Sequence, residues 1–188
     1  MEQQSVRKTY KYRRDPTSEQ EQALGVTLWR CHTLYTVVLE QRKLWWARGQ
    51  DVGASYYQQK AELPGIKAAC PEFSEIHAHV LQDVILRLDR AFQAFSRRVT
   101  AGETPGYPRF QGRGRYNRFT FPAYGNGAVL DGGALNLSKI GRIRIRLQRP
   151  LQGTPKPVTI SREADGWYAC LSDGEVPPQP PPLTGQRH

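Results

Sequence analysis

The segment 5-SVRKTYKYRRDPTSEQEQAL-24 contains the change of periodicity that decides how this chain folds. Over residues 5–13 the side chains alternate between two faces, with the two-residue period of a β-strand. The Asp15-Pro16 step ends this strand, because proline disfavours helical backbone at the preceding residue and cannot donate to a sheet ladder. A lone strand leaves its backbone groups unpaired, so we expect it to pair with strands much later in the chain.

A helix begins directly after the proline. Ser18 and Glu21 have the spacing of a capping box, in which each side chain binds the other's free backbone N–H group. We expect this helix to run to about Arg48 and to stop at Gly49. Its apolar stripe recurs at helical spacing and consists of Leu24, Leu28, Cys31, Tyr35, Val38 and Leu39.

Two further helices are predicted before Gly102. A short helix covers residues 55–62 and is ended by Pro64. A long helix opens at Ser74 and ends near Gly102. Its broad apolar face consists of Ile76, Val80, Leu81, Val84, Ile85, Leu88, Phe92, Phe95 and Val99. The three helices together form one helical layer.

Beyond Gly102, glycine, proline and asparagine separate short strand-like pieces. These pieces are residues 118–124, 128–131, 134–138, 141–147, 156–162 and 166–172. Sequences typical of tight turns join several of them, at 131-DGG-133, 139-KIG-141 and 164-ADG-166. Short strands closed by tight turns favour a small barrel, so the fold class is α+β, with the helical layer inserted into the sheet.

The composition points to a polyanionic partner. The chain has 27 Lys and Arg against 17 Asp and Glu, a formal net charge of +10, which attracts nucleic acid first and an anionic membrane surface second. It has no run of about 18 apolar residues and no signal-peptide stretch, so no membrane span or export is predicted. Three distant cysteines, Cys31, Cys70 and Cys170, indicate a reducing compartment, so we expect a cytoplasmic protein.

The stretch 107-YPRFQGRGRYNRFTF-121 places arginines between aromatic rings and contains no acid. Arginines bind phosphates through a planar fork, and aromatic rings offer stacking surfaces for unpaired bases. We therefore predict that Arg113 and Arg115 contact nucleic acid. In the alternative interpretation, Tyr107, Phe110 and Phe119 fill the junction between helices and barrel, and the arginines only solvate it.

Two strands carry further cationic faces. Arg142, Arg144 and Arg146 are spaced by two residues, so they point the same way, and their mutual repulsion costs stability unless a polyanion is near. The first strand contributes Arg7, Lys11 and Arg13. An ordinary solvated sheet face is the alternative for both. The four histidines lack metal-ligand spacing, with His77 and His79 expected on different sides of a helix, so no metal, cofactor or catalytic residue is predicted.

The order of these blocks resembles the N-terminal half of the TnpB/OrfB transposon proteins, RNA-guided DNA endonucleases that are ancestors of type V CRISPR effectors. After the basic strand, the matching blocks are YRRDPTSEQEQAL, LEQRKLWW, YYQQKAELP, FSEIHAHVLQDVILRLDRAFQAFSRRV, GYPRFQGRGRYNRFTFP, LSKIGRIRIRL and VTISREADGWY. The similarity runs over roughly residues 6–176, and the order of the blocks is more specific than any one block.

The resemblance implies a small OB-like wedge β-barrel interrupted by an inserted helical recognition lobe, which together hold a guide RNA and read a target-adjacent motif in double-stranded DNA. The implied parts are residues 1–16 (first barrel strand), 17–102 (recognition lobe, with a helix-turn-helix region), 103–176 (remaining barrel) and 177–188 (proline-rich tail). In the family, a RuvC-like nuclease domain with an inserted zinc ribbon begins after that proline-rich stretch. This chain stops before it, so we expect no nuclease activity from this chain.

Motif-reading residues of the family are carried over block by block. A tyrosine in the block matching SYYQQKAEL falls on Tyr56, and a threonine in the block matching RFTFP falls on Thr120. Polar side chains of the helix matching FSEIHAHVLQ fall on His79 and Gln82, of which Gln82 can pair with an adenine edge or simply face solvent. Ala78 and His79 replace longer side chains of some relatives, which leaves open the sequence that is read.

The resulting prediction is a nucleic-acid-binding part of a TnpB/OrfB-like, transposase-associated protein, with guide RNA and double-stranded DNA as partners and no membrane. The resemblance also implies a prokaryotic, nucleoid-associated location in the cytoplasm. Three alternatives stay open. The chain could be half of a split endonuclease completed by a separately encoded RuvC part. It could be a truncated remnant without function. It could also be a general RNA-binding structural protein, which would bind regardless of guide RNA or DNA motif.

Overall fold

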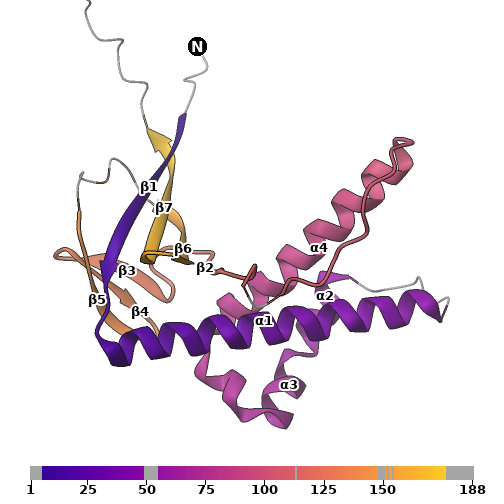
Figure 1. The fold of residues 1–188 in the computed structure, drawn as a ribbon, viewed down its shortest axis with the longest axis horizontal. Coiled ribbons are helices and arrows are strands. Elements are labelled where there is room, and N and C mark those ends of the chain that lie inside the picture. Colours follow the sequence, from indigo (N-terminus) through magenta and orange to yellow (C-terminus); the bar gives the residue numbers. More distant parts are fainter. Residues whose placement is uncertain are drawn as a thin grey trace, which may run out of the picture.

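The computed structural model of this chain describes residues 6–48, 55–112, 114–147, 151, 153 and 155–176. Strand, helices and strands follow one another as predicted, and the described residues combine a helical part with an antiparallel sheet (Figure 1). The elements are β1 (Val6–Asp15), α1 (Ser18–Ala47), α2 (Tyr56–Ala61), α3 (Leu63–Ala69), the 3-10 helix η1 (Pro71–Glu75), α4 (Ala78–Thr100), β2 (Arg118–Phe121), β3 (Ala128–Asp131), β4 (Ala134–Leu137), β5 (Gly141–Ile145), β6 (Pro155–Glu163) and β7 (Gly166–Val176).

The first strand occupies the middle of the sheet. The seven strands are ordered β2-β6-β7-β1-β5-β4-β3, and every pair is antiparallel. Tyr12 lies opposite Ala169 of β7, and Arg14 lies opposite Ile145 of β5. The prediction that the first strand pairs with later strands is therefore confirmed. The OB-like wedge barrel stays a prediction, because strand order alone does not establish it.

Alternation along β1 separates a buried face from a charged one. Tyr12 and Arg14 are buried, whereas Lys11 and Arg13 are exposed. Among the described residues, the Arg14 guanidinium has no hydrogen-bond partner, and burial lowers the pKa of this group. Because the side-chain period of a strand is two, a single register shift would bury the cations and expose the aromatic face.

Helix α1 begins one residue earlier than the predicted cap implies. Thr17, not Ser18, is the N-cap, because it keeps an extended backbone (φ −67°, ψ 164°) after Pro16. The Thr17 Oγ1 accepts from the Gln20 backbone N–H at 3.3 Å, and Gln20 Oε1 accepts from the Thr17 N–H at 3.1 Å. Gln20 also donates to the Arg142 carbonyl at 2.7 Å, which ties the start of the helix to β5.

The predictions for Pro64 and Ser74 were wrong. Pro64 lies in the first turn of α3 and starts that helix, because a proline there gives up an N–H group that the first turn leaves unpaired anyway. Residues 71–75 form the 3-10 helix η1, and Ile76 is buried in an extended conformation (φ −100°, ψ 139°). Helix α4 therefore begins at Ala78, with His77 as its N-cap.

Helix α4 joins the two parts of the fold. It packs on α1 and contacts β2, and the chain beyond it returns alongside α4 to reach the sheet (Figure 1). Phe119 and Phe121 of β2 are completely or almost completely buried. None of the helices in the described residues is both long and apolar enough to cross a membrane.

Candidate nucleic-acid interface

Residues 105–117, here called the linker, connect α4 to β2 and lie against α1. His32 Nε2 lies 2.6 Å from the Gln111 carbonyl, and the Tyr35 hydroxyl donates to the Arg109 carbonyl at 3.3 Å. The buried ring of Tyr116 packs against the rings of His32 and Tyr35. The linker backbone is thus held by side chains of a helix that is far away in the sequence.

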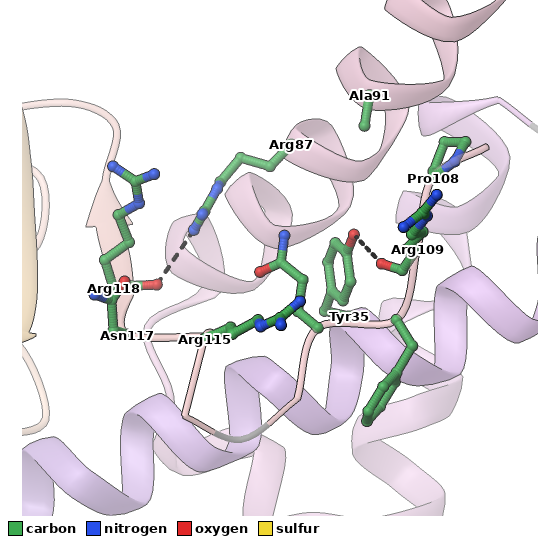
Figure 2. Close-up of a pocket in the computed structure, with 10 residues that line it drawn as sticks. Tyr35, Arg87, Ala91, Pro108, Arg109, Arg115, Asn117 and Arg118 are labelled. Atoms are coloured by element: carbon green, nitrogen blue, oxygen red, sulfur yellow. Dashed lines mark hydrogen bonds between the residues drawn. The ribbon is translucent and has the colours of Figure 1, made fainter. Parts of the chain in front are cut away.

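Four arginines gather around a pocket of about 420 Å³ that opens between α4 and the linker. Arg87 comes from α4, Arg109 and Arg115 from the linker, and Arg118 from the start of β2 (Figure 2). Arg87 donates from Nη1 to the Arg118 carbonyl at 3.2 Å, which joins the helix to the sheet. We call these residues the arginine pocket; its other lining residues are Tyr35, Ala91, Pro108, Phe110, Gln111 and Asn117.

The lining of the arginine pocket contains no carboxylate. In the described part of the chain, seven cations form ion pairs with acids, and no pocket arginine is among them. Asp83 lies on the same helix as Arg87. Burial raises the pKa of the Asp83 carboxyl, and the positive charges of Arg87 and Arg90 offset only part of this rise. Four arginines that line one recess make it electropositive, so an anion bound in it would be stabilised.

Of the two predicted linker arginines, Arg115 lines the pocket, whereas Arg113 lies outside the described residues. The segment around these arginines contains both buried aromatic rings and an exposed one. Tyr116, Phe119 and Phe121 are buried, while Phe110 has 53% of its surface exposed. The interpretation that rings fill the helix–sheet junction thus fits Phe119, and Phe110 is the ring that remains accessible.

The cationic run of β5 alternates as predicted, although its strand ends at Ile145. Arg142 and Arg144 are exposed, and the intervening Ile143 is buried. Arg146 lies just beyond the strand, and its Nε is 2.7 Å from Asp15 Oδ2. The three arginines share an exposed face, but one of them is already neutralised.

The cations of β1 are engaged by the β6–β7 hairpin. Lys11 Nζ lies 2.6 Å from Glu163 Oε1 and 4.2 Å from the centre of the Tyr168 ring. Arg13 donates to the Asp165 carbonyl at 3.0 Å. Arg7 belongs to the β1 backbone, and its side chain lies outside the described residues.

A second recess continues the arginine pocket across the sheet. Asn117 and Arg118 line both hollows, and Lys11 lines the second one. Thr159 of β6 also lines the second recess, and its Oγ1 lies 2.9 Å from the Oγ1 of Thr120, one of the predicted motif-reading residues. Arg87, Arg118 and Lys11 thus line two adjoining recesses, here called the basic track, in which Lys11 is already paired with Glu163.

Two other predicted residues lie at the start of α4. His79 Nδ1 is 3.0 Å from the Asn126 side-chain nitrogen, and Gln82 follows one turn later, half-buried. The rings of His77 and His79 meet edge to face with centres 5.4 Å apart. The expectation that these histidines diverge was wrong, because His77 is a cap with non-helical backbone (φ −58°, ψ 131°).

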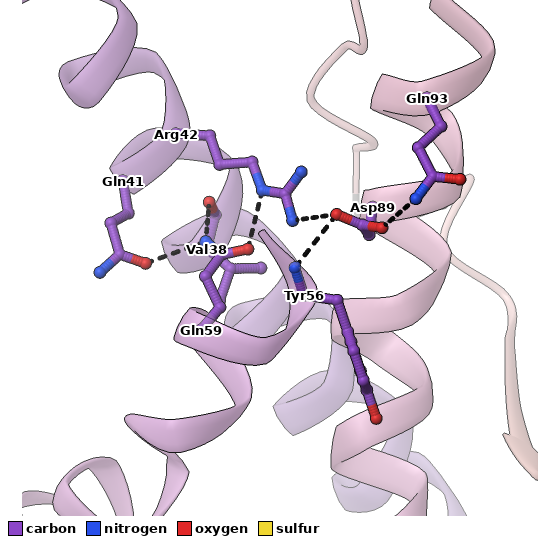
Figure 3. Close-up of polar contacts among 7 residues, drawn as sticks. All are labelled: Val38, Gln41, Arg42, Tyr56, Gln59, Asp89 and Gln93. Atoms are coloured by element: carbon purple, nitrogen blue, oxygen red, sulfur yellow. Dashed lines mark hydrogen bonds and ion pairs between the residues drawn. The ribbon is translucent and has the colours of Figure 1, made fainter. Parts of the chain in front are cut away.

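Tyr56 begins α2 and is positioned by a buried polar network (Figure 3). Its backbone N–H donates to Asp89 Oδ1 at 3.2 Å, and the same oxygen accepts from Arg42 Nη2 at 2.7 Å. Arg42 also donates to Gln59 Oε1 at 2.8 Å, while Gln93 donates to the other Asp89 oxygen. Asp89 lies seven residues beyond Gln82, about 10 Å along α4, so Tyr56 contacts the middle of this helix whereas His79 lies at its start.

Arg87, Arg109 and Arg118 were not selected from the sequence. Arg109 and Arg118 belong to the acid-free stretch around Arg113 and Arg115, so the signal that indicated those two residues was also present for them. Arg87 gave no such signal, because one arginine on a long amphipathic helix usually faces solvent. Only the return of the linker alongside α4 brings it into the pocket.

A family model for the helix-turn-helix domain of OrfB proteins matches residues 1–51. Within that range, the described residues 6–48 form β1 and the single helix α1.

Two relatives are named as RNA-guided DNA endonucleases. One, from Streptomyces pristinaespiralis, is 30% identical over 184 residues, which is 94% of this chain and 44% of the relative. The other, InsQ of Escherichia coli, is 33% identical over 99 residues, which is 51% of this chain and 23% of the relative. The chain thus spans less than half the length of either relative.

Proposed function

We propose that this chain, which belongs to the TnpB/OrfB family, binds nucleic acid at the junction between its helices and its sheet. The observation that carries this proposal is the arginine pocket, a recess lined by four arginines and no carboxylate. Phosphate groups satisfy such a cluster through charge and through paired N–H donors. The recess around Lys11 extends the same track along the sheet.

We further propose that the bound nucleic acids are a guide RNA and a motif in double-stranded DNA. The relatives named as RNA-guided DNA endonucleases support this. So do the polar, partly exposed side chains at the predicted motif-reading positions, which are Tyr56, His79, Gln82 and Thr120. In this proposal residues 17–102 act as the recognition lobe. Residues 1–16 and 103–176 act as an OB-like wedge barrel, and the outward arginines of β5 contact phosphates.

Binding, rather than cleavage, is the role that we propose for this chain itself. Among the described residues, no three His, Cys, Asp or Glu side chains form a group able to hold a metal ion. A second candidate is that the chain works with a separate RuvC part, which the endonuclease names of the two relatives suggest. A cleavage assay distinguishes binding alone from a split endonuclease: Mg²⁺ and a RuvC part are added to the RNA-bound chain, and only the split endonuclease would then cut DNA.

The binding proposal is tested by the salt dependence of affinity. We expect log Kd for a labelled structured RNA to vary steeply with log salt concentration, because bound phosphates release counterions. Replacing both Arg109→Gln and Arg115→Gln, two exposed linker residues, should reduce the slope by about one to two, since each lost phosphate contact removes about 0.7–0.9. Fluorescence anisotropy over a salt series measures this.

The matched control is Arg97→Gln with Arg98→Gln, which removes two charges from the last turns of α4. Arg98 makes only a long, exposed ion pair with Glu103 at 4.0 Å, so this variant should fold normally. We expect it to keep the wild-type slope. Equal slopes for the wild type and the linker variant, or equal losses in both variants, would contradict the proposal.

A further inference from the structure

We infer that the arginine pocket holds one unpaired nucleotide, with its phosphate among the guanidinium groups and its base stacked on Phe110. This inference rests on the proposed nucleic-acid binding and specifies what part of the strand occupies this site. It applies to the shared chemistry of unpaired RNA and single-stranded DNA.

The phosphate end of the site is formed by the guanidinium groups. Arg109 and Arg115 are exposed, and no described residue neutralises them. Arg87 is half-buried and is held in place by its bond to the Arg118 carbonyl and by the Tyr116 ring, 5.5 Å from its guanidinium carbon. One fixed and two adaptable guanidinium groups suit a tetrahedral phosphate that is approached from several sides.

The base end of the site is formed by Phe110 and two amides. The Phe110 ring is 53% exposed and leans edge-on against His32, with ring centres 5.7 Å apart. Tyr35, the other ring of the pocket, is 6% exposed and cannot offer a free face. The side chains of Gln111 and Asn117 line the same pocket, and amides can donate to and accept from base edges.

The walls of the pocket are held before any ligand arrives. Tyr35 and His32 bind the carbonyls of Arg109 and Gln111, respectively. The backbone N–H groups of Arg115 and Tyr116 both donate to the Gly112 carbonyl, at 2.8 and 3.2 Å, which folds the linker into a turn beside the pocket. A preformed site avoids part of the ordering cost of binding.

The shape of the site favours an unpaired nucleotide. A recess of about 420 Å³ has the size of a small-ligand pocket. A base inside a duplex is stacked on both faces and paired at its edge, so it cannot enter such a recess. An unpaired nucleotide can turn its base onto an aromatic ring while its phosphate remains on the basic track.

The test compares two single strands that carry the same phosphates. One is an RNA of about ten nucleotides, and the other is its abasic counterpart of the same length. We expect wild-type protein to bind the intact strand at least about fivefold more tightly, because stacking of one base on an aromatic ring is worth about 1–3 kcal/mol. Phe110→Ala should lose this preference, and Phe110→Trp should keep it.

Trp46→Ala is the matched control, because Trp46 is an exposed ring (66%) on α1 that does not line the pocket. It should leave the preference unchanged. Equal affinity of wild type for intact and abasic strands, or an undiminished preference in Phe110→Ala, would overturn the inference. Either result, together with a steep salt slope for the structured RNA, would leave the proposed function standing, whereas failure to bind the structured RNA would refute that function. The affinity for a DNA strand of the same sequence, compared with the affinity for the RNA strand, shows which of the two nucleic acids the site prefers.

Discussion

Arg144 and Arg146 belong to the same cationic run, but their surroundings differ. The Arg146 Nε lies 2.7 Å from Asp15 Oδ2, whereas no carboxylate pairs with Arg144 in the described residues. An arginine that already holds a carboxylate must give it up before it can bind a phosphate. At the scale of single residues, the availability of a guanidinium group therefore matters more than its presence.

A first prediction follows for the arginines of β5. Replacing Arg142→Gln and Arg144→Gln together should flatten the salt slope of RNA binding, by up to about one per lost phosphate contact. Arg146→Gln should change it less, because the positive charge of this residue is offset by Asp15. Anisotropy titrations over a salt series compare the two variants. A larger effect from Arg146→Gln than from the pair would show that the ion pair opens on binding.

The three cysteines should differ in reactivity. Burial raises the pKa of the Cys31 thiol to about 12, so almost no thiolate forms near neutral pH, and raises the pKa of the half-buried Cys170 less strongly. With a thiol-specific reagent at about pH 8, we expect Cys70 to react first, Cys170 more slowly, and Cys31 only after unfolding. Mass spectrometry of the labelled peptides measures the order. Rapid labelling of Cys31 in the folded protein would contradict its burial.

At the scale of elements, three helices are fastened by one buried network. Arg42 of α1 and Asp89 of α4 form an ion pair at 2.7 Å, with side chains 4% and 10% exposed. Gln59 of α2 accepts from Arg42 and donates to the Val38 carbonyl at 2.9 Å. The short helix α2, only six residues long, would be marginal alone, so its position depends on these bonds.

We predict that Asp89→Asn lowers the free energy of unfolding by about 3–5 kcal/mol, because it leaves the buried Arg42 charge without its partner. Arg42→Met combined with Asp89→Leu should cost clearly less, since it removes both charges together. Urea unfolding followed by circular dichroism measures these differences. A loss below about 1 kcal/mol for Asp89→Asn would mean that the network contributes little.

At the scale of the whole molecule, the basic track exists because distant segments meet. Strand β1 lies between β7 and β5, and Asn117 and Arg118 connect the arginine pocket to the recess that contains Lys11. The track therefore depends on residues 6–48, on α4 and on the β6–β7 hairpin at once. Loss of β1 would remove the centre of the sheet as well as one end of the track.

Much of the fold could be predicted from local patterns. The strand pieces at 128–131 matched β3, and the other strands were found within a few residues of their ends. The errors fell where the competing signals were short: the cap at Thr17, the start of α3 at Pro64, and the 3-10 helix before α4. One residue of extended backbone is enough to move a helix start, and sequence periodicity does not resolve such a shift.

Periodicity and composition were sufficient for the order of the strands and of the long helices α1 and α4, for the alternating faces of β1 and β5, and for the excess of positive charge. These properties depend on neighbours in the chain. Which arginines are free is a property of the folded chain, because ion pairs join residues as far apart as Lys11 and Glu163. The arginine pocket arises in the same way, since Arg87 and Arg115 come together only when the linker returns to α4.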